Sequence, residues 1–310
     1  REGDLAAAAA GYRDVLASRP DHIDAAHYLG MVYYQQGDLA RSIKLVARAA
    51  QARPEDSAIL ANLGLVLLGA GRNREAGQCL EKSVSLQPDQ PDALLNLALA
   101  HSAFGRFDSA AACYRRVLRL IPGHAAARLS LAQIFLNARQ PGEALSTLEA
   151  GLSLDPDDPD LRLALGQARE LAGDVAGAVE TFRRTAETHP SHRGRAMTRL
   201  SAALRKLERP ASALMAARSA AWADPDNHGA WKAVGQALKE LNCLEAAAEA
   251  FRRSHRLLRT PGGSEGQHLP TFSRTSPAKL RHDIEQIEYL EKQGLADGEL
   301  HSVAKTLRTV

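Results

Sequence analysis

The chain has few aromatic residues, few cysteines, little net charge and no long apolar run. Three Cys among 310 residues exclude a disulfide-stapled scaffold and favour a reducing compartment, so we expect a cytoplasmic protein. The 39 Lys and Arg nearly balance the 36 Asp and Glu, which excludes a uniformly basic nucleic-acid binder. The best candidate for a membrane span, residues 58–71, is too short to cross a bilayer and contains Asn62.

Aromatic residues make up only 5% of the chain, yet hydrophobic residues reach 45%, which is typical of a folded protein rather than a disordered one. The sequence begins at Arg1 rather than Met, and no secretory signal pattern follows. We therefore interpret the chain as a piece of a longer protein whose targeting segment is missing.

The sequence repeats itself with a period of 34 residues. Because of this repeat, the number of domains cannot be inferred from the length of the chain. The prolines that mark the period are Pro20, Pro54, Pro88, Pro122, Pro156 and Pro190, with Pro225 one residue later than expected. A second series, in the same phase, has small residues: Gly30, Gly64, Ala98, Ala132, Gly166, Ser201 and Gly235. A third series has mostly large residues: Tyr12, Val46, Leu80, Tyr114, Leu148, Phe182, Ala217 and Phe251.

Each repeat is interpreted as two antiparallel helices. Apolar residues recur at helical spacing in two stretches, for example Leu94 and Leu97 in the first and Tyr114 and Val117 in the second. Gly105 lies between them, where it can adopt a positive φ and end the first helix. Proline ends the second helix. One such hairpin cannot bury both faces, so it must stack on its neighbours.

These repeats resemble the tetratricopeptide repeat. The resemblance implies an all-α fold, a right-handed superhelical solenoid of antiparallel helical hairpins, over residues 1–260. We expect a half unit followed by seven full units that begin near Ile23, Ser57, Pro91, Ala125, Pro159, Arg193 and His228. There are departures from the pattern: Ala217 stands at a large position, and Arg139, Glu208 and Asn242 replace the glycine between the helices.

Stacked hairpins form an extended concave surface, and the resemblance implies that the first helix of each unit lines it. The partner-binding residues that we expect there are His27, Tyr34, Asn62, Leu65, Leu68, Asn96, Leu99, Gln133, Asn137, Arg195, Arg205, Lys206, Lys232, Gln236 and Lys239.

The middle of this surface is apolar, although the repeat core does not require it. The apolar residues are Leu65, Leu68, Leu95, Leu99, Leu129 and Leu136. An exposed apolar patch of this kind favours a protein partner. The alternative is a tight superhelical curvature, in which these side chains contact neighbouring helices.

Asn62 and Asn96 occupy the same position in consecutive units. An asparagine amide can donate to a backbone carbonyl and accept from a backbone N–H at once, so a series of them could hold an extended peptide of any sequence. The pair resembles the asparagine ladder in the repeat array of O-GlcNAc transferase. Only two units carry it here, and a polar residue on a helix surface is the alternative interpretation.

Positive charge is concentrated late in the repeats. Residues 193–259 hold 13 Lys and Arg against 6 Asp and Glu, a local net charge of +7. This segment favours an acidic peptide or an anionic surface as partner, and its alternative is a solvent-exposed face of long helices. No aromatic residues are interleaved to stack on bases, so we do not expect nucleic acid.

The sequence offers no catalytic constellation, and we expect no cofactor, no metal and no enzymatic activity in this chain. Cys79 and Cys113 lie one repeat apart, too far for one metal or an easy disulfide. His22 and Asp24 have the His-x-Asp spacing of non-haem iron sites, but they lie at a repeat junction and lack a third ligand.

After the repeats, residues 261–276 are expected to form a linker and residues 277–310 a helix pair that caps the array or starts another domain. The stretch 275–286 is similar to a segment of bacterial proteins in which a repeat array precedes a 2-oxoglutarate/Fe(II) dioxygenase domain.

Two functional hypotheses follow. The first is a non-enzymatic interaction module that binds a peptide or protein segment in the concave groove. The alternative is the substrate-recruiting region of a larger enzyme, a dioxygenase or a glycosyltransferase, whose catalytic domain lies outside this chain. The sequence does not indicate the oligomeric state.

Overall fold

The computed structural model describes residues 2–259, which are helical throughout apart from short turns. The helices are α1 (Glu2–Ser18), α2 (Ile23–Gln35), α3 (Leu39–Ala52), α4 (Ser57–Gly69), α5 (Asn73–Leu86), α6 (Pro91–Ala103), α7 (Phe107–Leu120), α8 (Ala125–Asn137), α9 (Pro141–Leu152), α10 (Pro159–Leu171), α11 (Val175–Thr188), α12 (Arg193–Lys206), α13 (Pro210–Ala223), α14 (His228–Glu240) and α15 (Leu244–Arg259). A 3₁₀ turn, Pro190–His192, precedes α12. The expected linker and C-terminal helix pair lie outside the described residues.

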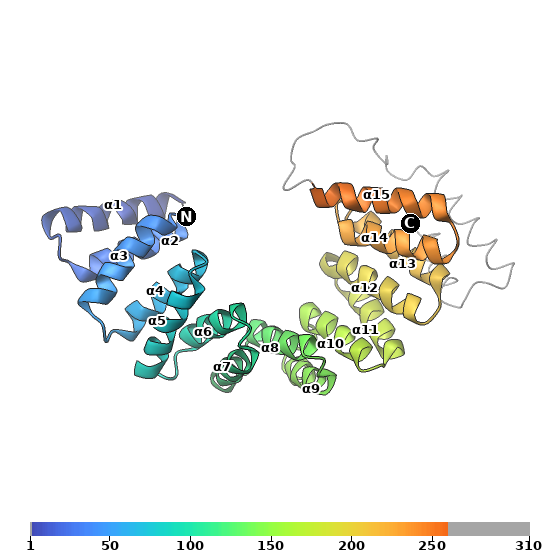
Figure 1. Ribbon diagram of the computed structural model, residues 1–310, viewed down its shortest axis with the longest axis horizontal. Helices are drawn as coiled ribbons and strands as arrows, with labels where there is room; N and C mark the ends of the chain where they lie inside the picture. The colour runs from blue at the N-terminus through green and yellow to red at the C-terminus, as the bar shows by residue number, and fades with distance from the viewer. Residues whose placement is uncertain (1, 260–310) are drawn as a thin grey trace. The chain divides into compact units, whose positions relative to one another are not determined.

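The first helix of each predicted full unit begins at the residue that the repeat pattern predicts. The described part of the chain divides into two compact units, an N-terminal unit that ends at Ala138 and a C-terminal unit that begins at Arg139. In the N-terminal unit α1 packs on α2, and the pairs α2–α3, α4–α5 and α6–α7 form hairpins (Figure 1). In the C-terminal unit the pairs α10–α11, α12–α13 and α14–α15 do the same. The expected fold class, an all-α solenoid of helical hairpins, is confirmed.

The turn between the two helices of a unit requires a left-handed backbone. Glycine supplies it at four units, with φ of 81°, 71°, 69° and 91° at Gly37, Gly71, Gly105 and Gly173. The three residues that replace glycine adopt the same conformation at a steric cost, with φ of 56° at Arg139, 58° at Glu208 and 60° at Asn242. The turn geometry is therefore kept even where the sequence departs from glycine.

Small residues of the first helix face large residues of the second. A Cβ placed on Gly166 would lie 2.4 Å from Cε1 of Phe182, whose side chain is fully buried. Gly64 meets Leu80 at the same distance, and Gly30 meets Val46 at 2.5 Å. The small and large series of the sequence are thus the two sides of one close helix contact.

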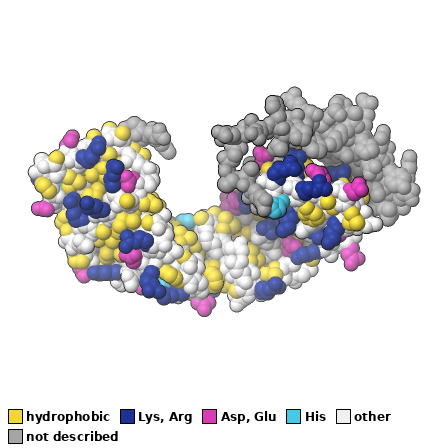
Figure 2. Space-filling view, turned by 45° about the horizontal axis from the view of Figure 1, so that its top comes forward, with side chains coloured by type: hydrophobic (Ala, Val, Ile, Leu, Met, Phe, Trp, Pro, Cys, Tyr) yellow, Lys and Arg dark blue, Asp and Glu magenta, His cyan; other side chains and the backbone are white. Residues whose placement is uncertain are grey.

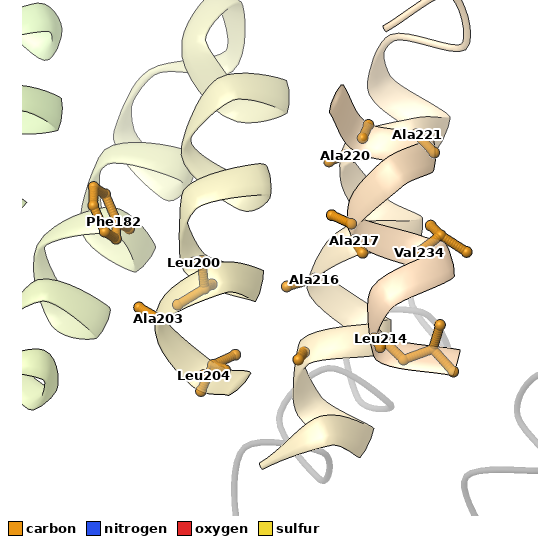
Figure 3. Close-up of a cluster of buried hydrophobic side chains, with 14 of the residues drawn as sticks. Phe182, Leu200, Ala203, Leu204, Leu214, Ala216, Ala217, Ala220, Ala221 and Val234 are labelled. Atoms are coloured by element: carbon orange, nitrogen blue, oxygen red, sulfur yellow. The ribbon is translucent and has the colours of Figure 1, made fainter. Parts of the chain in front are cut away.

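The C-terminal unit has an alanine-rich core. Phe182 of α11 and Leu200 of α12 lie in the same cluster as Leu214 and Ala217 of α13 and Val234 of α14 (Figure 3). Ala217 takes the place of a large residue in its series, and Ser201 takes the place of the small residue in the same repeat. Ser201 on α12 is larger than the glycine of other repeats, and Ala217 on α13 is smaller than the large residue of other repeats. The two changes in volume oppose each other, and both side chains are buried.

Candidate peptide-binding surface

First helices of neighbouring repeats contact one another within each unit. In the N-terminal unit α2 packs against α4 and α4 against α6, and in the C-terminal unit α12 packs against α14. In Figure 1 the first helices α2, α4 and α6 follow one another on one side of the N-terminal unit, with α3, α5 and α7 on the other. The expected partner-binding residues therefore share one layer of helices in each unit.

The apolar residues of this layer are intermediate between core and surface. Leu65, Leu68 and Leu95 are half-buried, as are Leu129 and Leu136, whereas Leu99 on α6 is 50% exposed. Leu99 is open, as the patch interpretation predicts, and the other five side chains are covered in part. Tyr28 on α2 is equally exposed and stacks on Tyr12 of α1 with ring centroids 5.9 Å apart.

His27 and Asn62 bind each other between the first helices α2 and α4. Nδ2 of Asn62 lies 2.8 Å from Nε2 of His27, so the neutral ring accepts a hydrogen bond from the amide. His27 is only 6% exposed, which corrects the expectation that its side chain lines an open surface. Burial lowers the pKa of His27 below its usual range, and the nearby carboxylates of Asp56 and Asp24 only partly oppose this effect.

The other amides of the surface differ in their partners. Asn96 makes no hydrogen bond to any described residue, and its side chain is half-buried beside the exposed Leu99. On α8, Nε2 of Gln133 donates to Oδ1 of Asn137 at 2.8 Å, and both side chains are exposed. Tyr34 packs against Gly69 of α4, where an added Cβ would lie 3.0 Å from its ring.

Ion pairs link the first helices of the C-terminal unit, and the sequence reasoning did not anticipate them. Nη1 of Arg195 lies 2.7 Å from Oδ1 of Asp160, which joins α12 to α10. Nζ of Lys206 lies 2.7 Å from Oε1 of Glu170, which is only 14% exposed.

A third ion pair joins α12 to α14. Nη2 of Arg205 lies 2.6 Å from Oε1 of Glu240, and its Nη1 donates to Oε1 of Gln236 at 2.8 Å. Three of the five expected cations, Arg195, Lys206 and Arg205, thus have carboxylate partners one repeat away. The spacing of 35 residues between Asp160 and Arg195, and between Arg205 and Glu240, is the signal that could have revealed them.

Residues with potential for metal chemistry have structural roles. Nδ1 of His22 caps α2 by accepting from the backbone N–H of Ala25 at 3.1 Å, and Asp24 binds Arg53 through two hydrogen bonds. Within residues 2–259, no group of three or more His, Cys, Asp or Glu side chains could hold a metal ion. Burial raises the pKa of the Cys79 and Cys113 thiols, so neither is an activated nucleophile.

Among the helices of residues 2–259, none is both long enough and apolar enough to cross a bilayer.

Comparison with known families agrees with the repeat geometry. One tetratricopeptide repeat model matches residues 62–125 and 129–192, and a second matches residues 1–63 and 103–151. The chain belongs to the tetratricopeptide repeat family. The repeats make it a protein–protein interaction module. No curated protein matches the sequence.

Two solved structures show how far the fold of this tetratricopeptide repeat chain is shared. A tetratricopeptide repeat protein from Parabacteroides merdae is 16% identical and has a TM-score of 0.65, with 78% of this chain and 94% of that chain covered. The MamA protein is 21% identical with a TM-score of 0.52, and the match covers 55% of this chain and 93% of that chain. At these identities the similarity establishes the fold.

Proposed function

We propose that the N-terminal unit binds an extended peptide or protein segment across its first helices α2, α4 and α6. The observation that carries this proposal is the pair formed by Asn96 and Leu99 on α6. Leu99 is 50% exposed, and the amide of Asn96, three residues earlier on the same helix face, has no partner among the described residues. Neither side chain serves the contact between small and large residues that holds the repeat together.

The amides of Asn62 and Asn96 are suited to a peptide backbone. Asn62 donates one hydrogen to His27, which fixes its amide and leaves Oδ1 free to accept from a peptide N–H. Asn96 can both donate and accept. Neighbouring first helices lie about 8–10 Å apart, which is the length of about three residues of extended chain. Two fixed positions on one peptide can therefore be held by the two amides at once.

Leu65, Leu95 and Leu99 supply the apolar part of the surface. Covering the exposed half of Leu99 would contribute about 1 kcal/mol, because full burial of a Leu side chain contributes about 1.5–3 kcal/mol. Hydrogen bonds to the two asparagine amides add about 0.5–1.5 kcal/mol each. These contacts are modest individually, so the affinity of the surface depends on several of them acting together.

The experiment is a selection of binding peptides from a displayed random library with the whole chain, followed by calorimetry on the selected peptides. Asn96→Ala combined with Leu99→Ala should weaken binding by about thirtyfold, since the lost contacts together contribute about 2 kcal/mol. The matched control is Leu86→Ala on α5, a second-helix leucine that is 38% exposed. Equal losses in both variants, or a library that yields no binder, would contradict the proposal.

A further inference from the structure

Among the Lys and Arg residues on the first helices α12 and α14, six differ in whether they have a carboxylate partner: Arg195, Arg199, Arg205, Lys206, Lys232 and Lys239. Three of them, Arg195, Arg205 and Lys206, pair with carboxylates of adjacent repeats and so link α10, α12 and α14. Figure 2 shows Lys and Arg side chains (dark blue) on this unit with Asp and Glu side chains (magenta) among them. Carboxylates therefore compensate the charge of Arg195, Arg205 and Lys206, and the local excess of positive charge lies on the other cations.

Arg199, Lys232 and Lys239 have no carboxylate partner among the described residues, and we call them the open cations. With the Gln167 amide oriented to accept, its oxygen lies 2.8 Å from Nη2 and 3.1 Å from Nε of Arg199. This partner is neutral and leaves the guanidinium charge uncompensated. Lys232 and Lys239 are exposed and make no ion pair within the described residues.

The open cations lie on the two neighbouring first helices α12 and α14. Lys232 and Lys239 are seven residues apart, so they project from the same face of α14 about 10.5 Å apart along its axis. Arg205 on α12 reaches Gln236 and Glu240 on α14, which sets the register of these two parallel helices. Arg199 lies six residues before Arg205 and therefore at the level of Lys232.

We infer that the open cations form a binding site for an acidic, extended peptide segment. An extended polyproline II chain repeats every three residues and rises about 9.3 Å in that length, which matches the axial spacing of the two lysines. Acidic side chains at every third position would thus meet Lys232 and Lys239 in turn, with Arg199 at the level of Lys232 on the neighbouring helix α12. The neighbouring Trp231 is half-buried under Arg253, whose guanidinium carbon lies 4.0 Å from its ring centroid, so its face is not free to stack on a nucleic-acid base.

This inference rests on the proposed function in one respect, that the ligand is a peptide, but it concerns different residues. The probe is a fluorescent peptide of Glu-Pro-Pro repeats, and its partner probe has Gln in place of Glu. Anisotropy with the whole chain should show binding of the Glu peptide that weakens as salt is added, and no binding of the Gln peptide. Equal binding of both peptides, or of neither, overturns the inference.

Variants separate the open cations from the paired ones. Changing Arg199, Lys232 and Lys239 to Gln should weaken binding of the Glu peptide by about tenfold or more. Asp160→Asn with Arg195→Gln removes an ion pair without changing net charge, and affinity should stay within about twofold of the unaltered chain. A control with the same loss of net charge carries the changes Lys44→Gln, Arg48→Gln and Arg119→Gln on second helices of the N-terminal unit.

The outcomes also separate this inference from the proposed function. The Leu99→Ala chain should bind the Glu peptide like the unaltered chain, because Leu99 is not part of this site. Loss of Glu-peptide binding in the three-residue control as well as in the open-cation variant would show a diffuse charge effect and refute the site. Tighter binding of polyuridylate than of the Glu peptide refutes the inference too, in favour of a nucleic-acid ligand.

Discussion

The substitution Gly166→Ala tests whether α10 and α11 can approach closely only because a small residue on α10 faces a large residue on α11. The added Cβ would lie 2.4, 2.7 and 2.9 Å from three ring atoms of Phe182. Real contacts of this kind are not shorter than about 3 Å, so the ring or the helix must move. Phe182 is fully buried and stiff, because its ring is enclosed by the core on all sides.

The magnitude follows from two opposing effects. Overpacking in a tight core costs about 1–3 kcal/mol, and the three short contacts place this site near the upper limit. Replacing glycine by alanine within a helix returns about 0.5–1 kcal/mol. We therefore expect a net loss of about 2 kcal/mol, seen as a melting temperature lower by about 4–8 °C for a folded region of this size.

Circular dichroism during thermal and urea unfolding measures the effect, and two further variants define its cause. Gly142→Ala on α9 has nothing within 4 Å of the new Cβ, so it should leave the protein as stable or more stable. Adding Phe182→Leu to Gly166→Ala reproduces the pair Ala132–Leu148 of another repeat and should restore part of the loss. If Gly166→Ala alone is as stable as the unaltered chain, the close-approach explanation is wrong.

Two more predictions follow from the turns and from the buried histidine. Glu208→Gly should stabilise the protein by about 0.5–1 kcal/mol in urea unfolding, because glycine adopts the observed φ of 58° without strain; Gly173→Ala, at a φ of 91°, should destabilise it, and the opposite signs would contradict the reasoning. Burial holds the pKa of His27 in the folded protein below the ordinary value of about 6.5, so the unfolded chain binds a proton that the folded one does not. Stability should therefore be fully present above pH about 6.5 and decline as the pH falls through that value. His27→Gln should flatten this decline, whereas His255→Gln at an exposed site should not.

The positions of the helices could be predicted from the sequence because several residue types mark the same boundaries in each repeat. Prolines, inter-helix glycines and the small and large series all have the same period. Where one series departs from its pattern, as at Ala217, the others still mark the repeat. Even the positive φ of Glu208 and Asn242 follows from the glycine positions of the other repeats. These features depend on local backbone preferences and on one contact that recurs in every hairpin.

The surface could be predicted only in part, because its side chains bind partners on neighbouring repeats that the sequence pattern does not identify. The burial of His27 depends on Asn62 of the next repeat, and the ion pair of Lys206 depends on Glu170 of the previous repeat. These choices require the register between neighbouring hairpins, which the repeat period alone does not specify. The exposure of Leu99 likewise depends on how closely neighbouring first helices approach.

Site-specific photocrosslinking can locate a bound peptide on the first helices of the N-terminal unit. A photoreactive benzoylphenylalanine is placed either at Leu99 on α6 or at Leu86 on α5, and a selected peptide is added before irradiation. Peptide binding on the first helices should give a covalent adduct with the peptide at position 99 and none at position 86. An adduct at position 86 with none at position 99 would contradict it.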